Sequence, residues 1–227
     1  TPYEWPSVSS YFGIVDLAGF PKDVYYMYQS EWTDKTVLHI FPHWNWKAGQ
    51  TVDVWAYYNN ADEVELFVNG KSVGKRSKKG DDLHVMWRIP FEAGTLKVIS
   101  RKDGKVVLEK EIKTAGNPSQ LKLTADRSTI KADKNDLSFI TVDILDDKGT
   151  LAPNANNEIN FSLKGNGKIV GVCSGDPVSH ESYKGNKHTA LAGKCLVIVQ
   201  SGDKSGRLEL TAKANGLKQS TIVITTE

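Results

Sequence analysis

The chain has 227 residues, a length typical of one or two domains, and its 29 basic residues nearly balance its 27 acidic ones. Because nucleic-acid binding depends on an excess of basic charge, this balance predicts no nucleic-acid partner. No stretch approaches the roughly twenty apolar residues of a membrane-spanning helix, so no membrane span is predicted either.

The first predicted element is a helix from about Pro21 to Trp32. Proline suits the first helical position, and apolar side chains recur at every fourth residue on one face. Such a stripe needs an apolar surface to pack on, and all other predicted elements are β-strands. That surface therefore belongs either to the first β domain or to a part of a larger protein, from which we expect this chain to be cut. The stripe consists of Phe20, Val24, Tyr28 and Trp32.

A first set of strands follows, in which apolar and polar residues alternate as in half-buried antiparallel strands. Asn69-Gly70 and Asp103-Gly104 supply the positive-φ residues that two-residue hairpins require. The basic run Lys75–Lys79 is expected to be a solvated loop rather than a phosphate-binding patch. Six or seven strands within about eighty residues predict an immunoglobulin-like sandwich. The strands are predicted at Thr36–Phe41, Thr51–Tyr58, Glu63–Asn69, Leu83–Pro90, Thr95–Lys102 and Lys105–Lys113.

Residues Thr114–Gln120 interrupt the pattern with glycine and proline and predict a linker. A second set of strands follows, with connections rich in Asp, Asn and Gly. The predicted fold is therefore mainly β, with two immunoglobulin-like β-sandwich domains in tandem after a short helix. The second set is predicted at Gln120–Asp126, Ser138–Asp146, Glu158–Lys164, Gly167–Val172, Lys194–Ser201, Arg207–Ala214 and Ser220–Thr226.

Four motifs occur in order: YFGIVDLAGFPKDVYYMYQSEW, PHWNW, VELFVNGKSVG and TAGNPSQLKLTADRSTIKAD. Together they resemble the C-terminal part of bacterial glycoside hydrolase family 2 enzymes of the β-galactosidase type, nearly end to end. The resemblance implies three parts. Residues 1–33 would be a remnant of the last loop and helix of a (β/α)8 barrel, residues 34–115 an immunoglobulin-like sandwich, and residues 116–227 a second, invasin-type sandwich.

The resemblance also implies that the chain has no catalytic residue, because retaining enzymes of this family use two glutamates on barrel strands. Such glycosidases need two carboxyl groups roughly 5 Å apart, whereas most acidic residues here lie in predicted turns. Only Glu4, Asp16 and Glu31 lie in the barrel-like segment. We therefore expect a non-catalytic accessory region that buttresses the barrel and shapes the substrate entrance, while the full-length enzyme hydrolyses terminal β-galactosides.

No cofactor and no metal are expected, and the implied partners are the catalytic barrel, a β-galactoside or polysaccharide, and a second copy of the chain. A periplasmic or extracellular location follows from the resemblance only. Two other classes remain open, a carbohydrate-binding module and an adhesin-like surface module. Exposed aromatic residues in a row with polar neighbours would favour the first, and featureless sandwiches would favour the second.

An aromatic cluster in the PHWNW segment is the main candidate site. His43, Trp44 and Trp46 could contact a sugar, because pyranose C–H faces pack well on indole rings, or could pack in an interface. Packing is the favoured interpretation, since large aromatic residues commonly fill sandwich cores and domain interfaces. Trp55, Tyr57 and Tyr58 belong to the same group of candidates for sugar stacking, but Trp55 and Trp87 lie within predicted strands and are expected in the core.

The stretch Ser174–His188 contains histidines and carboxylates whose spacing could suit a divalent cation. An Asp-Pro turn and solvated loop residues explain the same pattern, so we expect it to organise a loop. The residues concerned are Asp176, His180, Glu181 and His188.

Cys173 and Cys195 are the only cysteines. Two cysteines in a chain of this length do not make a disulfide framework. Cys195 lies in an apolar strand and resembles a position where the family often keeps a buried thiol. Whether the two pair is left open.

Overall fold

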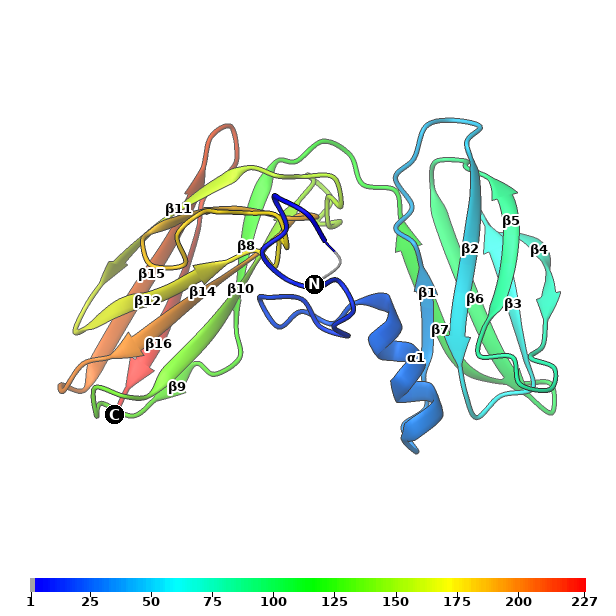
Figure 1. Cartoon of the computed structure of the whole chain (residues 1–227), viewed down its shortest axis with the longest axis horizontal. Coiled ribbons are helices and arrows are strands. Elements are labelled where there is room, and N and C mark those ends of the chain that lie inside the picture. Colours follow the sequence, from blue (N-terminus) through cyan, green and yellow to red (C-terminus); the bar gives the residue numbers. More distant parts are fainter. Residues whose placement is uncertain (1–2) are drawn as a thin grey trace. The chain divides into compact units, whose positions relative to one another are not determined.

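The computed structural model describes residues 3–227 and divides the chain into two units (Figure 1). One unit comprises residues 21–115, and the other comprises residues 116–227 together with residues 3–20. Each contains a two-sheet β-sandwich, so the prediction of a mainly β fold is confirmed. The segment 1–33, predicted as a single remnant, is divided between the units, and residues 1–2 lie outside the described residues.

Helix α1 (Asp23–Trp32) is the only helix within residues 3–227, and no helix of this described range is long and apolar enough to cross a membrane. It begins two residues after the predicted start at Pro21. Lys22, at the N-cap position, makes no side-chain capping bond. Asp23 in the first turn places a negative charge at the positive end of the helix dipole.

The helix packs on the first sandwich, as predicted, through one side. The Tyr26 ring stacks on the His39 ring with centroids 3.9 Å apart, and the Asp23 carboxylate contacts His39 Nε2 at 2.8 Å. Ser30 is buried on the same side, and its carbonyl accepts a hydrogen bond of 3.0 Å from Asn59 Nδ2. These contacts are polar and aromatic rather than aliphatic.

The predicted apolar stripe lies on the opposite side of this helix. With about 100° of rotation per residue, Val24, Tyr28 and Trp32 point away from the direction shared by Tyr26 and Ser30. The Tyr28 and Trp32 rings contact each other at a centroid distance of 4.5 Å, and Trp32 is 77% exposed. The first sandwich therefore does not cover the stripe. Phe20 precedes the helix and belongs to the other unit.

The first sandwich consists of a sheet in the order β1-β2-β5 and a sheet in the order β4-β3-β6-β7. Much of its core comes from the alternation of buried and outward side chains along the strands. In β2, for example, Val52, Val54 and Ala56 are buried, because successive side chains point to opposite faces of a sheet. The strands are β1 (Leu38–Phe41), β2 (Thr51–Tyr58), β3 (Glu63–Val68), β4 (Lys71–Arg76), β5 (Val85–Pro90), β6 (Thr95–Lys102) and β7 (Lys105–Lys113).

The predicted hairpins form at Asn69-Gly70 and Asp103-Gly104, where all four residues have positive φ. The first hairpin corrects one expectation. Lys75 and Arg76, expected in a solvated loop, belong to β4, because the tight turn returns the chain along β3 and pairs Arg76 with Val64.

The second sandwich consists of a sheet in the order β12-β14-β10-β8 and a sheet in the order β13-β11-β15-β16-β9. Two short strands, β9 and β13, were not predicted from the sequence. Strand β9 pairs with β16 in parallel. The strands are β8 (Gln120–Ala125), β9 (Thr129–Ile130), β10 (Leu137–Leu145), β11 (Glu158–Lys164), β12 (Gly167–Cys173), β13 (Lys187–Thr189), β14 (Lys194–Ser201), β15 (Gly206–Ala214) and β16 (Ser220–Thr226).

Asp146, directly after β10, fixes the start of the second sandwich and is only 1% exposed. Its carboxylate accepts backbone N–H bonds from Gly116 at 2.9 Å, Lys148 at 2.9 Å and Thr150 at 2.8 Å. Burial by itself raises the pKa of Asp146, but these three donors outweigh it and hold the pKa below its usual value.

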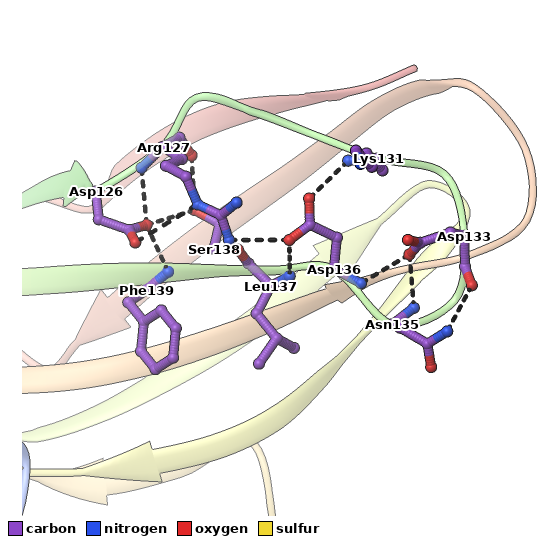
Figure 2. A network of polar contacts seen from close by, with 9 residues as sticks. All are labelled: Asp126, Arg127, Lys131, Asp133, Asn135, Asp136, Leu137, Ser138 and Phe139. Atoms are coloured by element: carbon purple, nitrogen blue, oxygen red, sulfur yellow. Dashed lines mark hydrogen bonds and ion pairs between the residues drawn. The ribbon is translucent and has the colours of Figure 1, made fainter.

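A second carboxylate network closes the connection from β8 to β10 (Figure 2). Asp126 Oδ1 accepts N–H bonds from Arg127 at 2.7 Å and Phe139 at 2.8 Å. Asp136 accepts from the Lys131 N–H and the Arg127 guanidinium, both at 2.9 Å. Side-chain carboxylates thereby satisfy backbone N–H groups of this connection on either side of the short strand β9, at Arg127 and Lys131.

Candidate functional site

Trp44 lies in the core of the first sandwich. Its side chain is 0% exposed and packs edge-on against Phe91 at a centroid distance of 5.0 Å. Its indole N–H donates a 2.8 Å hydrogen bond to the Glu92 carbonyl. Both faces of the indole are therefore covered by protein, and no face is free for a sugar ring.

Trp46 and His43 form a stacked pair beside the same core, with ring centroids 4.7 Å apart. The Trp46 indole donates a 2.7 Å bond to the His43 carbonyl. Between them, Asn45 exchanges two hydrogen bonds with the backbone of Ala115, of 2.8 and 2.9 Å. Burial lowers the pKa of His43, against the opposing effect of Asp23. The segment thus ties the start of the sandwich to its last residue.

A band of aromatic rings lies on the outer face of the β1-β2-β5 sheet. Trp55 was expected in the core, but Val54 and Ala56 on either side are 0% exposed, so the alternation directs Trp55 outward. The Trp55 ring stacks on His84 at 4.0 Å with an interplanar angle of 9°. Phe41, opposite Trp55 in the β1–β2 register, continues the band.

Trp87 differs from Trp55 because it occupies the inward side of β5. It is 2% exposed, as expected for a core residue, and its indole donates a 3.1 Å bond to the Gly74 carbonyl. This bond links the edge strands of the two sheets. The strand pattern therefore separates the two tryptophans once their positions in the alternation are known.

The loop between β12 and β13, together with His188 of β13, contains the histidines and carboxylates considered for a metal. Glu181 accepts bonds from the N–H and the hydroxyl of Thr189 and lies 3.2 Å from His188 Nδ1. Asp176 accepts the Val178 N–H at 2.9 Å within its own turn. Within residues 3–227, no group of three or more such side chains could hold a metal ion.

The same loop is joined to the segment of residues 3–20. The Val8 N–H donates to the Pro177 carbonyl at 2.8 Å, and His180 Nε2 donates to the Pro6 carbonyl at 2.9 Å. The His180 ring also contacts the Trp5 ring, with centroids 4.2 Å apart and the planes tilted by 30°. Three contacts thus hold residues 5–8 against the loop.

Asp16 fixes the other end of this segment. Its Oδ1 accepts the N–H groups of Ala18 at 2.8 Å and Phe20 at 2.9 Å. The carboxylate lies against Gly175, where a Cβ atom would come within 2.2 Å of an Asp16 oxygen and φ is +80°. Only glycine suits this position, for both reasons.

The remaining acids of the barrel-like segment also lack a catalytic arrangement. Glu31 forms a 2.9 Å ion pair with Lys78 in the first unit, Asp16 serves the turn in the second, and Glu4 is exposed. A retaining glycosidase would require two of them facing each other across a sugar site.

Both cysteines are free thiols. Cys195 is 0% exposed in β14, and burial raises the pKa of its thiol to about 12. Cys173, half-buried at the end of β12, also has a raised pKa through burial. Neither is a reactive thiolate at neutral pH.

Comparison with known proteins gives two family matches. The family described as glycoside hydrolase family 2 C-terminal domain 5 matches residues 121–223. A second family, described as a domain of unknown function (DUF4982), matches residues 49–108.

Relatives extend the match to the whole chain. "Beta-galactosidase BoGH2A" of Bacteroides ovatus is 61% identical over 227 residues, which is 100% of this chain and 27% of the relative. The crystal structure of a β-glycosidase from Bacteroides vulgatus superposes with a TM-score of 0.93 and 34% identity, over 98% of this chain and 29% of its own. A β-glucuronidase from glycoside hydrolase family 2 gives a TM-score of 0.85 and 27% identity, over 98% and 23%.

These matches, with two sandwiches and one helix, define the class of protein as the C-terminal region of a larger glycosidase. The chain corresponds to the C-terminal region of glycoside hydrolase family 2 enzymes, which confirms the resemblance seen in the sequence. It spans between 23% and 29% of the length of these three relatives.

Proposed function

We propose that this chain is a non-catalytic accessory region of a β-galactosidase-type enzyme, whose sandwiches buttress the catalytic barrel and shape the substrate entrance. The 61% identical β-galactosidase supports terminal β-galactosides as the substrates of the full-length enzyme. In this proposal, the catalytic barrel of the full-length enzyme corresponds to the part of these relatives that lies outside the match to this chain.

The observation that carries the proposal is the two-sided helix α1. Its polar side is bound by the first sandwich, through His39 and Asn59. Its aromatic side keeps Trp32 77% exposed beside Tyr28. An exposed apolar stripe on a fixed helix is typical of a surface that a further domain covers.

A chimera tests this proposal. The region of Beta-galactosidase BoGH2A that matches this chain is replaced by the chain itself, and Trp32→Asp is introduced. We expect the unsubstituted chimera to hydrolyse nitrophenyl β-galactoside and the Trp32→Asp chimera to lose thermal stability and activity. In the isolated chain, the same substitution should leave the unfolding midpoint unchanged, because Trp32 contacts little there.

The matched control is Val106→Asp, at a 54% exposed position on β7. It introduces the same charge on a surface that the proposal leaves free, so the chimera should tolerate it. A Trp32→Asp chimera as stable and active as the Val106→Asp chimera would contradict the proposal.

A carbohydrate-binding module is the second candidate function, and the outer-face band of Phe41, Trp55 and His84 favours it. An aromatic ring on the outer face of a sheet can stack on a sugar ring. Retention of the chain on immobilised galactan, lost on Trp55→Ala, would support this function.

A periplasmic or extracellular location and self-association through the sandwiches complete the proposal, on the family resemblance alone. Cell fractionation tests the first, and sedimentation velocity of the purified chain tests the second.

A further inference from the structure

The loop between β12 and β13 holds the segment of residues 3–20 at two places, although this segment contains no helix or strand of its own. At the first place, His180 Nε2 donates a 2.9 Å hydrogen bond to the Pro6 carbonyl. At the second, the Asp16 carboxylate lies against Gly175. The segment therefore takes its conformation from a part of the chain that is distant in sequence.

The loop can act as a fixed support because strands on both sides tie it down. The Tyr183 carbonyl accepts the Val172 N–H of β12 at 2.9 Å. The Glu181 carboxylate accepts the Thr189 N–H of β13 at 2.7 Å and also the Thr189 hydroxyl. Burial by itself raises the pKa of Glu181, but the bonds from Thr189 outweigh it and hold the pKa below its usual value. The acceptor is therefore charged at neutral pH, which strengthens these bonds.

The held segment displays large apolar side chains, since Trp5 is 81% and Phe12 is 79% exposed. Exposed apolar groups on a fixed backbone are typical of a surface that contacts something further. The family resemblance identifies the segment with the last loop of a (β/α)8 barrel, directly before the last helix. Loops that follow the strands of such a barrel build its active-site face. The proposed function thus places the segment at the substrate entrance.

We propose that the loop between β12 and β13 is a positioning element for the glycosidase reaction, with His180 and Gly175 as its positioning residues. Neither residue contacts the substrate. Both act through the segment of residues 3–20, because they remove its conformational freedom before the substrate arrives and leave no ordering cost to be met on binding. The inference rests on the proposed function, since it assigns a part of the second sandwich to the substrate entrance.

The first test measures the order of the segment in this chain by amide hydrogen exchange. The reporter is the Val8 N–H, which donates to the Pro177 carbonyl at 2.8 Å. His180→Ala should speed its exchange by about tenfold or more, while the Leu208 amide in β15 stays unchanged. His180→Gln should restore protection, because its amide N–H can donate to the Pro6 carbonyl.

The second test measures kinetics in the chimera with Beta-galactosidase BoGH2A. His180→Ala should raise the KM for nitrophenyl β-galactoside about five- to tenfold and leave kcat within about twofold, because a loosened entrance weakens ground-state and transition-state binding alike. His180→Gln should restore the KM. The matched control is Asn186→Ala, at an exposed position of the same loop, and it should change neither constant.

Gly175→Ala tests the other point of attachment, because the new Cβ atom would lie 2.2 Å from an Asp16 carboxylate oxygen and displace it. Its KM should rise as that of His180→Ala does. The double variant should be no more than about twofold worse than the more severe single variant, because both changes release the same segment. If Gly175→Ala does not fold, His180→Ala decides alone.

Unchanged exchange of the Val8 amide in His180→Ala would overturn the inference, as would an unchanged KM in an active chimera. A lower thermal midpoint without a change in KM would show that His180 is only structural and would overturn it as well. Fully additive effects in the double variant would contradict a shared route through the segment. An inactive unsubstituted chimera would refute the proposed function and the role at the entrance with it, whereas the exchange of Val8 separately decides whether the loop orders the segment.

Discussion

Replacing Trp44 with alanine should destabilise the first sandwich without affecting any ligand response. The indole is 0% exposed, and truncating a buried tryptophan costs about 3–5 kcal/mol. The Glu92 carbonyl would lose its 2.8 Å hydrogen bond, which adds about 1 kcal/mol. Because a domain of this kind is stable by about 5–15 kcal/mol, the first sandwich would lose a large part of its stability.

Tryptophan fluorescence during urea unfolding measures this loss selectively. Five of the six tryptophans lie in residues 21–115, and only Trp5 lies in the other unit. Trp44→Phe is the control, since it keeps a ring against Phe91 and loses only the N–H and part of the volume, at a cost of about 1–2 kcal/mol. A Trp44→Ala variant that remains stable but has lost affinity for a β-galactoside would show that Trp44 binds sugar rather than bracing the fold.

Three further predictions concern the carboxylates. Asp146→Ala removes the acceptor of three backbone N–H groups, of which those of the exposed residues Gly116 and Lys148 can turn to water, and should cost the second sandwich roughly 1–3 kcal/mol in urea unfolding followed by circular dichroism, whereas Asp146→Asn should cost less; equal costs would contradict this. The N–H of Lys131 and the Arg127 guanidinium hold the pKa of Asp136 below its usual value, so its contribution to stability is complete above about pH 4 and is lost as the pH falls further. Asp136→Asn should therefore flatten the acid side of the stability profile, and an unchanged slope would refute the assignment. Finally, the purified chain should not hydrolyse nitrophenyl β-galactoside; turnover that survives repurification and disappears on mutating Glu4, Asp16 or Glu31 would overturn the non-catalytic assignment.

The long strands were predictable because they carry their own alternation, as in Thr51–Tyr58 and Arg207–Ala214. Strand β4 (Lys71–Arg76) was not, because it is an edge strand whose polar side chains are mostly exposed, and its pairing follows from the Asn69-Gly70 turn. The two-residue strand β9 and three-residue strand β13 are too short for any period to be visible.

The candidate site was less predictable, because it depends on contacts between distant residues. His180 and Pro6 are 174 positions apart, and neither local pattern indicates the other. The sequence did mark the loop around His180 as unusual, by its clustered histidines and carboxylates. For Trp55, the sequence placed the residue within a strand, but the choice of face required its register among the buried neighbours Val54 and Ala56.

Helix α1 shows most clearly what a periodic sequence pattern can and cannot predict. The recurrence of Val24, Tyr28 and Trp32 correctly predicts an apolar face, but periodicity cannot say which partner covers it. In the structure, the sandwich binds the opposite, more polar face, through Asp23, Tyr26 and Ser30. An ordinary amphipathic helix places its apolar side against its own domain, so this arrangement is inverted. The hydrophobic free energy of the stripe is gained only when a second body covers Trp32, as required by our proposal that the rest of the enzyme packs on this helix.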